Sequence, residues 1–252
     1  MMPALFVGHG SPMNALSEND FSREWKRLGA TIERPRAILA VSAHWLRRGT
    51  AVTAMTQPAT IHDFYGFPEE LFSVQYQAPG SPELARRVAD LVGSTALDQE
   101  WGLDHGTWSV LVHMYPEANI PVIQLSLDIQ LSAQEHYDLG RRLQPLREEG
   151  VLILGSGDIV HNLGRMDWGR RQGFDWAESV NEQVKQWIKA EDHRSVIDCE
   201  KLGGDFKQAI PTPDHFWPLL YVLGASKVGE AMEFFNDAIL FGAISMTGVK
   251  IG

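Results

Sequence analysis

The sequence contains a single cysteine, Cys199, so the chain cannot form an internal disulfide. Charged residues on both sides of Cys199 indicate an ordinary helix surface rather than a reactive thiol. No apolar run is long enough to span a bilayer, and the first residues lack the basic segment with which a secretory signal begins. We therefore expect a cytoplasmic protein without a membrane partner.

Positive charge is also scarce. The chain has 22 Lys and Arg against 32 Asp and Glu, a formal net charge of -10. No basic cluster exceeds the pairs Arg141-Arg142 and Arg170-Arg171, whereas nucleic acids are bound through many such side chains. We therefore expect no nucleic-acid partner. With 44% hydrophobic residues, residues 1–252 are expected to form a single domain, as a monomer or small homo-oligomer.

Short apolar runs almost free of charge recur along the chain. They are Ala4 to Val7, Ala37 to Val41, Val122 to Leu125 and Val151 to Leu154. Such runs are typical of strands buried on both faces of a sheet. Two later runs, Met232 to Phe235 and Ala243 to Val249, are predicted to add edge strands.

Helical patterns separate these runs. One spans Ser132 to Glu149, opens with the capping box Ser132-x-x-Glu135 and is shortened or kinked by Pro145. Others span Pro82 to Leu91 and Trp176 to Lys189. Alternating strands and helices predict an α/β protein with three layers, α/β/α, around a largely parallel or mixed central sheet.

Three histidines follow predicted strands at their carboxyl ends. His9 stands in Gly8-His9-Gly10, His44 in Ser42-Ala43-His44-Trp45, and His161 a few residues beyond Leu154. Open α/β sheets bind ligands at that edge, and topology alone would bring these residues together. The pattern predicts a divalent metal held by histidines far apart in sequence, although a lone histidine is more often a hydrogen-bonded structural residue.

Two further histidines are candidates. His215 follows Thr212 and Pro213, a good N-cap and a good first helical residue, so it is predicted to lie in the first turn of a helix and to stay neutral there. His105 lies next to Gly106, which lets the backbone approach a ligand closely. The remaining histidines are assigned structural roles: His62, His113, His136 and His193.

The stretch from Gln57 to Pro82 is rich in proline and glycine and shows no clear periodicity. A loop of this length in a compact domain is usually functional, so we interpret it as a lid or pocket wall. Competing motifs are weak: Gly155-Ser156-Gly157 lacks the third glycine of a dinucleotide fingerprint and the lysine of a P-loop, and no Gly-x-Ser-x-Gly elbow is present.

The motifs occur together in an order that resembles the DOPA 4,5-dioxygenase branch of the class III extradiol ring-cleavage dioxygenases, in a bacterial form. The likeness runs from Met1 to Gly252. It is carried by Gly8-His9-Gly10-Ser11-Pro12-Met13, Ser42-Ala43-His44-Trp45, Ile61-His62-Asp63-Phe64, Gly102-Leu103-Asp104-His105-Gly106-Thr107-Trp108, His161-Asn162-Leu163 and Pro211-Thr212-Pro213-Asp214-His215.

This resemblance implies one divalent metal ion per chain, Zn(II) or Fe(II), bound by His9, His44 and His215, with His161 beside or on the metal. His161 also matches the acid-base histidine of the family, and His105 matches a histidine that contacts the substrate. The broader superfamily has a carboxylate as its third ligand, where this chain offers His215. An all-histidine set suits Zn(II) as well as Fe(II).

The implied reaction is extradiol cleavage of a DOPA-like catechol by O2. His161 would take and return a proton, His105 would assist, and Trp45, Trp108 and Phe64 are predicted walls that stack on the ring. Two alternatives stay open on the residues alone. One is a zinc hydrolase that acts through a metal-bound water, and the other is a metal-binding protein without catalysis.

Overall fold

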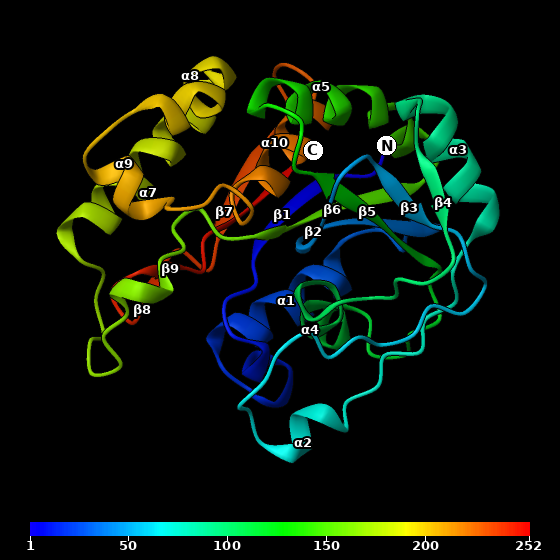
Figure 1. Ribbon diagram of the computed structural model, residues 1–252, viewed down its shortest axis with the longest axis horizontal. Coiled ribbons are helices and arrows are strands. Elements are labelled where there is room, and N and C mark those ends of the chain that lie inside the picture. The colour runs from blue at the N-terminus through cyan, green and yellow to red at the C-terminus, as the bar shows by residue number, and fades with distance from the viewer.

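An eight-stranded sheet runs through the middle of the computed structural model, which describes residues 1–252 (Figure 1). Its strand order is β4-β3-β5-β2-β6-β1-β10-β7, and the four central strands, β5, β2, β6 and β1, are parallel. The strands are β1 (Ala4–Gly8), β2 (Ala37–Arg47), β3 (Ala51–Thr53), β4 (Ala96–Asp98), β5 (Val122–Asp128), β6 (Val151–Gly157), β7 (Met232–Phe235) and β10 (Gly248–Ile251), with β8 (Ile239–Leu240) and β9 (Ile244–Ser245) forming a separate pair.

Helices cover both faces of this sheet (Figure 1). The helices are α1 (Asp20–Thr31), α2 (Glu69–Phe72), α3 (Pro82–Val92), α4 (His105–Met114), α5 (Ala133–Leu143), α6 (Pro145–Glu148), α7 (Asp175–Lys189), α8 (His193–Asp198), α9 (Asp205–Ala209) and α10 (Trp217–Ala225), with short 3-10 turns at Pro12–Leu16, Leu163–Arg165 and Cys199–Lys201. Side chains of α3, α5, α7 and α10 form the core on one face, and those of α1 and α4 form it on the other. The predicted three-layer α/β/α architecture is confirmed.

The apolar runs form strands because both of their faces are covered. In β1, Phe6 packs in the core on one face while Leu5 packs on the other, and both are fully buried. Alternation of side chains along a strand therefore requires apolar residues at every position. Of the two late runs, Met232 to Phe235 forms β7 at the sheet edge as predicted. The run from Ala243 to Val249 does not form an edge strand: it contains β9, in the separate pair, and the first two residues of β10, which lies inside the sheet between β1 and β7.

The predicted helices are present with small changes at their ends. Ser132 accepts the backbone N–H of Glu135, and the Glu135 side chain returns to the Ser132 backbone, so the capping box is formed. Pro145 divides this helix into α5 and α6, because proline cannot continue the hydrogen-bond ladder. No helix has the length and hydrophobicity needed to cross a membrane.

The prediction for His215 was wrong in one respect. Helix α10 begins at Trp217, so His215 lies in the turn before the helix and not in its first helical turn. The carbonyl of Pro213 accepts the N–H groups of both Phe216 and Trp217, at 2.9 Å each, which forms this turn. The ring of His215 is then held by Asp214.

The sequence pattern also predicted the wrong environment for Cys199, which was expected on a helix surface. Its side chain is fully buried and packs with Val196 in the core. The two residues are three positions apart on one side of this short helical segment, while the neighbouring charges face away, so charged flanks do not make the position exposed. Burial raises the pKa of the Cys199 thiol to about 12, so the thiol stays protonated at pH 7.

Both ends of the chain are tied to the buried guanidinium of Arg147. It donates to the carbonyl of Met2 at 2.8 Å and to that of Ile251 at 3.2 Å, and it forms two bonds with Glu230 at 2.7 and 2.8 Å. We expect Arg147→Met to lower the free energy of unfolding by about 3 kcal/mol, because the partly buried Glu230 carboxylate and two backbone carbonyls lose their buried partner. Urea unfolding followed by circular dichroism measures this loss.

Arg27→Met is the matched control. Arg27 pairs with Glu24 and Glu233 on the surface, with side-chain exposures of 45%, 24% and 45%. Exposed ion pairs contribute about 0–1 kcal/mol. Equal destabilisation by the two substitutions would contradict the role given to Arg147.

Candidate functional site

Histidines from separate elements meet at the carboxyl ends of the neighbouring strands β1, β2 and β6. His9 directly follows β1, and His44 lies near the end of β2, in a stretch where the register with β5 shifts between Val41 and Leu46. Such an irregularity redirects side chains at a sheet edge. In the sheet, Gly8 is paired with Gly157, and Ser42 with Ser156, so the ends of β1, β2 and β6 are level. Adjacent parallel strands thus bring together residues distant in sequence.

The nitrogen atoms of three histidines lie close together. Nε2 of His9 is 3.0 Å from Nε2 of His44, and the donor atoms of His9, His44 and His215 all lie within 4.8 Å of one another. In the order of the chain, these residues come from β1, β2 and the turn before α10. The structure therefore brings together the three residues expected to bind metal.

The other ring nitrogen of each of these histidines faces an oxygen atom. Nδ1 of His9 is 3.0 Å from Oγ of Ser156, Nδ1 of His44 is 3.4 Å from Oδ2 of Asp63, and Nδ1 of His215 is 2.5 Å from Oδ2 of Asp214. A carboxylate can only accept, so it selects the tautomer with the proton on Nδ1. The hydroxyl of Ser156 donates to the carbonyl of Gly106 and therefore accepts from Nδ1 of His9. Nε2 of each ring is then left with a lone pair, as in protein metal sites.

The donor set fits a divalent metal ion. Burial, and next the neighbouring imidazoles, holds the pKa of His9 and of His44 well below the ordinary value, so both rings are neutral at pH 7. A histidine nitrogen lies about 2.0–2.1 Å from a bound Zn(II), so two nitrogens on one ion lie about 2.9 Å apart at a right angle and about 3.3 Å apart at the tetrahedral angle. The separation of 3.0 Å between His9 and His44 matches this requirement.

His161 lies beside the three converging histidines. Its ring stacks on that of His215, with centroids 3.5 Å apart and planes within 6°. Its donor atom is grouped with those of His215 and Asp158, and not with those of His9 and His44. Burial, followed by the charge of His215, lowers the pKa of His161 to about 3, so the ring is neutral at pH 7.

His105 is held by the long segment that precedes α3. The backbone N–H of His105 donates to Oδ1 of Asp63 at 2.8 Å, and Nδ1 of its ring lies 2.9 Å from Oδ2. The ring packs against that of His44, with centroids 3.9 Å apart. Although burial opposes it, hydrogen bonding by His105 keeps the pKa of Asp63 below its usual range, so the carboxylate is charged. Asp63 therefore orients both His44 and His105.

A buried carboxylate sets where α4 begins, and hence where His105 lies. Asp104 caps this helix by accepting the N–H of Thr107 at 3.3 Å, and it also accepts the hydroxyl of Ser42 at 2.7 Å. Burial, and next the charge of Asp63, raises the pKa of Asp104 to about 6. Gly106 follows, and a Cβ there would come within 2.9 Å of the His44 ring. This explains why a glycine stands next to His105.

Of the three predicted aromatic walls, only Phe64 touches the histidines. Its ring meets that of His105 edge to face, with centroids 5.6 Å apart. Trp108 is fully buried, donates to the carbonyl of Ile61 at 2.8 Å and lies behind Phe64, with ring centroids 6.1 Å apart. Trp45 is stacked on Trp101 and makes no ring contact with the histidines. The segment from Gln57 to Pro82 thus supplies Asp63 and Phe64 to the site.

Four oxygen-bearing residues of this site were given no role by the sequence. They are Asp63, Ser156, Asp158 and Asp214. Asp63 lies inside a motif that carries the family resemblance, and Asp214 directly precedes His215, so the sequence offered a signal for these two residues. Ser156 lies on β6 and Asp158 directly follows it, whereas His9 follows the neighbouring strand β1, so no sequence spacing could have indicated their contacts with His9.

The four histidines assigned structural roles all lie outside the cluster. His62 is bonded to the carbonyl of Val74 at 2.9 Å, and His113 to that of Asn14 at 2.8 Å. His136 and His193 are bonded to tyrosine hydroxyls, both at 3.0 Å. His136 is fully buried against Trp217, although its neighbours in sequence are polar.

Ser156 provides a test of how His9 is positioned. We expect Ser156→Ala to weaken metal binding by about 10–100-fold, the usual effect of removing a group that orients a ligand. A chelator competition with Zn(II) measures the change. Ser109→Ala is the control, because the hydroxyl of Ser109 is buried on α4 without a protein partner. Equal affinities of the two variants would show that Ser156 does not orient His9.

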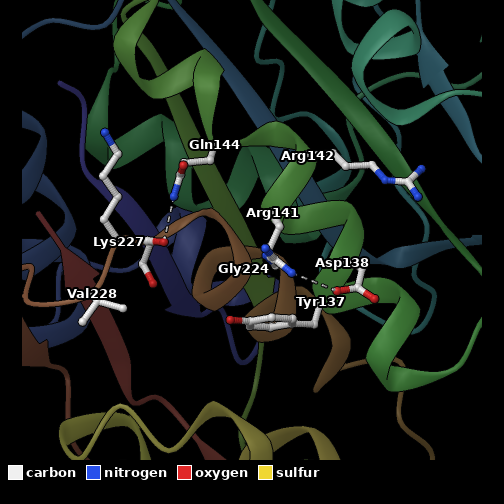
Figure 2. A pocket seen from close by; sticks show the side chains of 9 residues that line it. Tyr137, Asp138, Arg141, Arg142, Gln144, Gly224, Lys227 and Val228 are labelled. Carbon is white, nitrogen blue, oxygen red and sulfur yellow. Dashed lines mark hydrogen bonds and ion pairs between the residues drawn. The ribbon is translucent and has the colours of Figure 1, made fainter.

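A separate surface groove of about 840 Å³ lies between α5 and the end of α10 (Figure 2). No histidine lines it, and its cations are already bonded: Lys227 pairs with Glu148 at 2.6 Å, and Arg142 donates to the carbonyl of Val92 at 2.8 Å. Figure 2 shows Arg141 directed toward Asp138, one turn away on the same helix α5. The groove shares no residue with the histidine cluster.

Comparison with known proteins agrees with the geometry. Residues 3–249 match the family described as the catalytic LigB subunit of aromatic ring-opening dioxygenase. A protein of Escherichia coli K12 named 4,5-DOPA dioxygenase extradiol is 48% identical, over 100% of this chain and 95% of its own length. A protein of the same name from Beta vulgaris is 36% identical, over 97% and 94% respectively. The crystal structure of an uncharacterized Escherichia coli K12 protein superimposes with a TM-score of 0.86 at 42% identity, covering all of both chains.

Proposed function

Since the chain belongs to the LigB family of catalytic subunits of aromatic ring-opening dioxygenases, we propose that it opens the ring of a DOPA-like catechol at the 4,5 bond with O2. The observation that carries this proposal is the convergence of His9, His44 and His215, with donor atoms within 4.8 Å of one another. The relatives named for this reaction match nearly the whole chain, so we assign residues 1–252 to a single catalytic domain.

His9, His44 and His215 would hold the metal through Nε2, while Ser156, Asp63 and Asp214 fix the orientation of their rings. When bound there, the ion would supply redox chemistry and a common binding point for catechol and O2. We assign turnover to Fe(II), because Zn(II) has no redox chemistry. Zn(II) would bind the same three rings and give an inactive protein.

His161 is assigned the proton transfers. A catechol must lose a hydroxyl proton when it binds, and a neutral imidazole can accept it. The ring of His161 is neutral, and its stacking on His215 keeps it at the edge of the metal site. The protonated imidazole of His161 can later return the proton as the catechol ring opens. We therefore place His161 as the acid-base residue rather than as a fourth imidazole ligand.

His105 and Phe64 are assigned to the substrate. Because Nδ1 of His105 faces Asp63, its Nε2 is free to accept a hydrogen bond from the catechol. Phe64 stands edge to face against His105 and offers an apolar surface to the aromatic ring. Trp108 supports Phe64 from behind, and Trp45 takes no part in binding.

The test is oxygen consumption by the Fe(II)-reconstituted protein. With L-DOPA and a panel of other catechols, we expect O2 uptake together with a coloured semialdehyde product that carries both oxygen atoms of labelled O2. Absence of turnover on every catechol would contradict the proposal. Ester or amide hydrolysis by the Zn(II) form under argon would instead support the hydrolase alternative.

A further inference from the structure

Asp158 is a buried carboxylate that the roles described above do not use. It directly follows β6, and its side chain is 0% exposed. Oδ1 accepts the backbone N–H of Gly10 at 3.2 Å, but Oδ2 has no hydrogen-bond partner. Burying an unpaired carboxylate oxygen is costly, and nearly all such atoms in folded proteins are paired. The position therefore calls for a partner that the protein itself does not provide.

The unpaired oxygen faces the histidine cluster. Oδ2 of Asp158 lies 3.7 Å from Nε2 of His9, the same nitrogen that is 3.0 Å from Nε2 of His44. The donor atoms of Asp158, His161 and His215 lie within 4.8 Å of one another, so both Asp158 and His161 lie beside His215. Asp158 differs from His161 because its Oδ2 also approaches Nε2 of His9. The backbone N–H of Asp158 donates to the carbonyl of His215 at 2.9 Å, which ties the carboxylate to the turn that carries this histidine.

The other two carboxylates beside the rings face the opposite nitrogens. Oδ2 of Asp63 lies near Nδ1 of both His44 and His105, and Oδ2 of Asp214 lies near Nδ1 of His215. These two groups orient rings from behind. Asp158 differs, because its free oxygen lies on the Nε2 side of His9, where the three lone pairs converge.

We propose that Asp158 is a fourth protein ligand of the divalent metal in the substrate-free protein, bound through Oδ2. This inference rests on the proposed metal site of His9, His44 and His215. A carboxylate added to three neutral imidazoles lowers the net charge of a divalent site and is a common oxygen ligand for Fe(II) and Zn(II). A catechol that binds through both hydroxyl oxygens competes with Asp158 for this position.

The first test is the Zn(II) affinity of Asp158→Asn, measured by chelator competition on the metal-free full-length protein. We expect binding to weaken by more than about 100-fold, beyond the roughly 10–100-fold typical of groups that only orient ligands. Asp63→Asn is the matched control, since it makes the same carboxyl-to-amide change behind the rings and should stay within that range. An effect of Asp158→Asn no larger than that of Asp63→Asn overturns the inference.

The second test does not depend on whether a variant folds. In a crystal structure of the Zn(II)-loaded wild-type protein, Oδ2 of Asp158 is expected about 2.0–2.2 Å from the ion. An ion on His9, His44 and His215 with Asp158 outside contact distance overturns this inference and leaves the proposed function intact. An ion held by none of these histidines removes the proposed metal site as well.

Discussion

Replacing His44 with alanine is expected to abolish metal retention and to lower O2-dependent turnover by at least about 10³-fold, since the orientation of two reactants alone is worth effective molarities of about 10⁵ M or more. The ring of His44 lies at the centre of the cluster, with Nε2 3.0 Å from that of His9 and Nδ1 3.4 Å from Asp63. No nearby side chain can take its place, because His105 is already bonded to Asp63 through its backbone and its ring.

The measurement pairs metal analysis of protein purified without added metal with oxygen uptake after Fe(II) reconstitution. His193→Gln is the control, since this histidine is bonded to Tyr137 between α5 and α8 and lies outside the cluster. Its metal content and turnover should match the wild type. Full metal occupancy and unimpaired turnover in His44→Ala would rule out the assigned metal site.

The second large effect is expected from His161→Gln, with kcat lowered by about 10²–10⁴-fold, the usual contribution of a positioned acid-base group. Glutamine is polar and of similar reach, but it cannot take up a proton. The metal should remain bound, because the donor atoms of His9, His44 and His215 lie together without His161. We therefore expect this variant to keep the metal content of the wild type while its kcat falls.

Three measurements on His161→Gln distinguish the possible roles of this residue. Retained metal, a reduced kcat and loss of one limb of the pH profile would support proton transfer. Loss of metal in proportion to activity would make His161 a ligand instead. An unchanged kcat at all pH values would leave it as a side chain that only packs against His215, with which it stacks at a centroid distance of 3.5 Å.

Local patterns proved reliable where they depend on one element and its immediate surroundings. The apolar runs became β1, β2, β5 and β6 because both faces of the sheet are covered. The capping box at Ser132 and the break at Pro145 depend on bonds within a few residues. The start of α10 was misjudged because the carbonyl of Pro213 accepts the N–H groups of Phe216 and Trp217, which places Asp214 and His215 in a turn before the helix.

Predictions about single side chains were weaker wherever a distant element decides the outcome. Trp45 was expected to face the substrate, but its ring is stacked on Trp101, which comes from a different part of the chain. Cys199 has charged neighbours in sequence and is nevertheless fully buried. In both cases the packing between elements decides where the side chain lies, and the neighbouring residues in the sequence do not indicate those contacts.

By itself, the sequence determined the alternation of strands and helices, the acidic character of the chain, and the placement of His9 and His44 at the ends of buried strands. Only the tertiary structure decided which nitrogen of each ring is free, because that depends on oxygens brought from other elements, such as Asp63 on the long loop and Ser156 on β6. It also left one buried oxygen of Asp158 without a partner beside His9. Hydrogen bonding and burial depend on the residues that lie close in space, and the order of residues along the chain does not identify those residues.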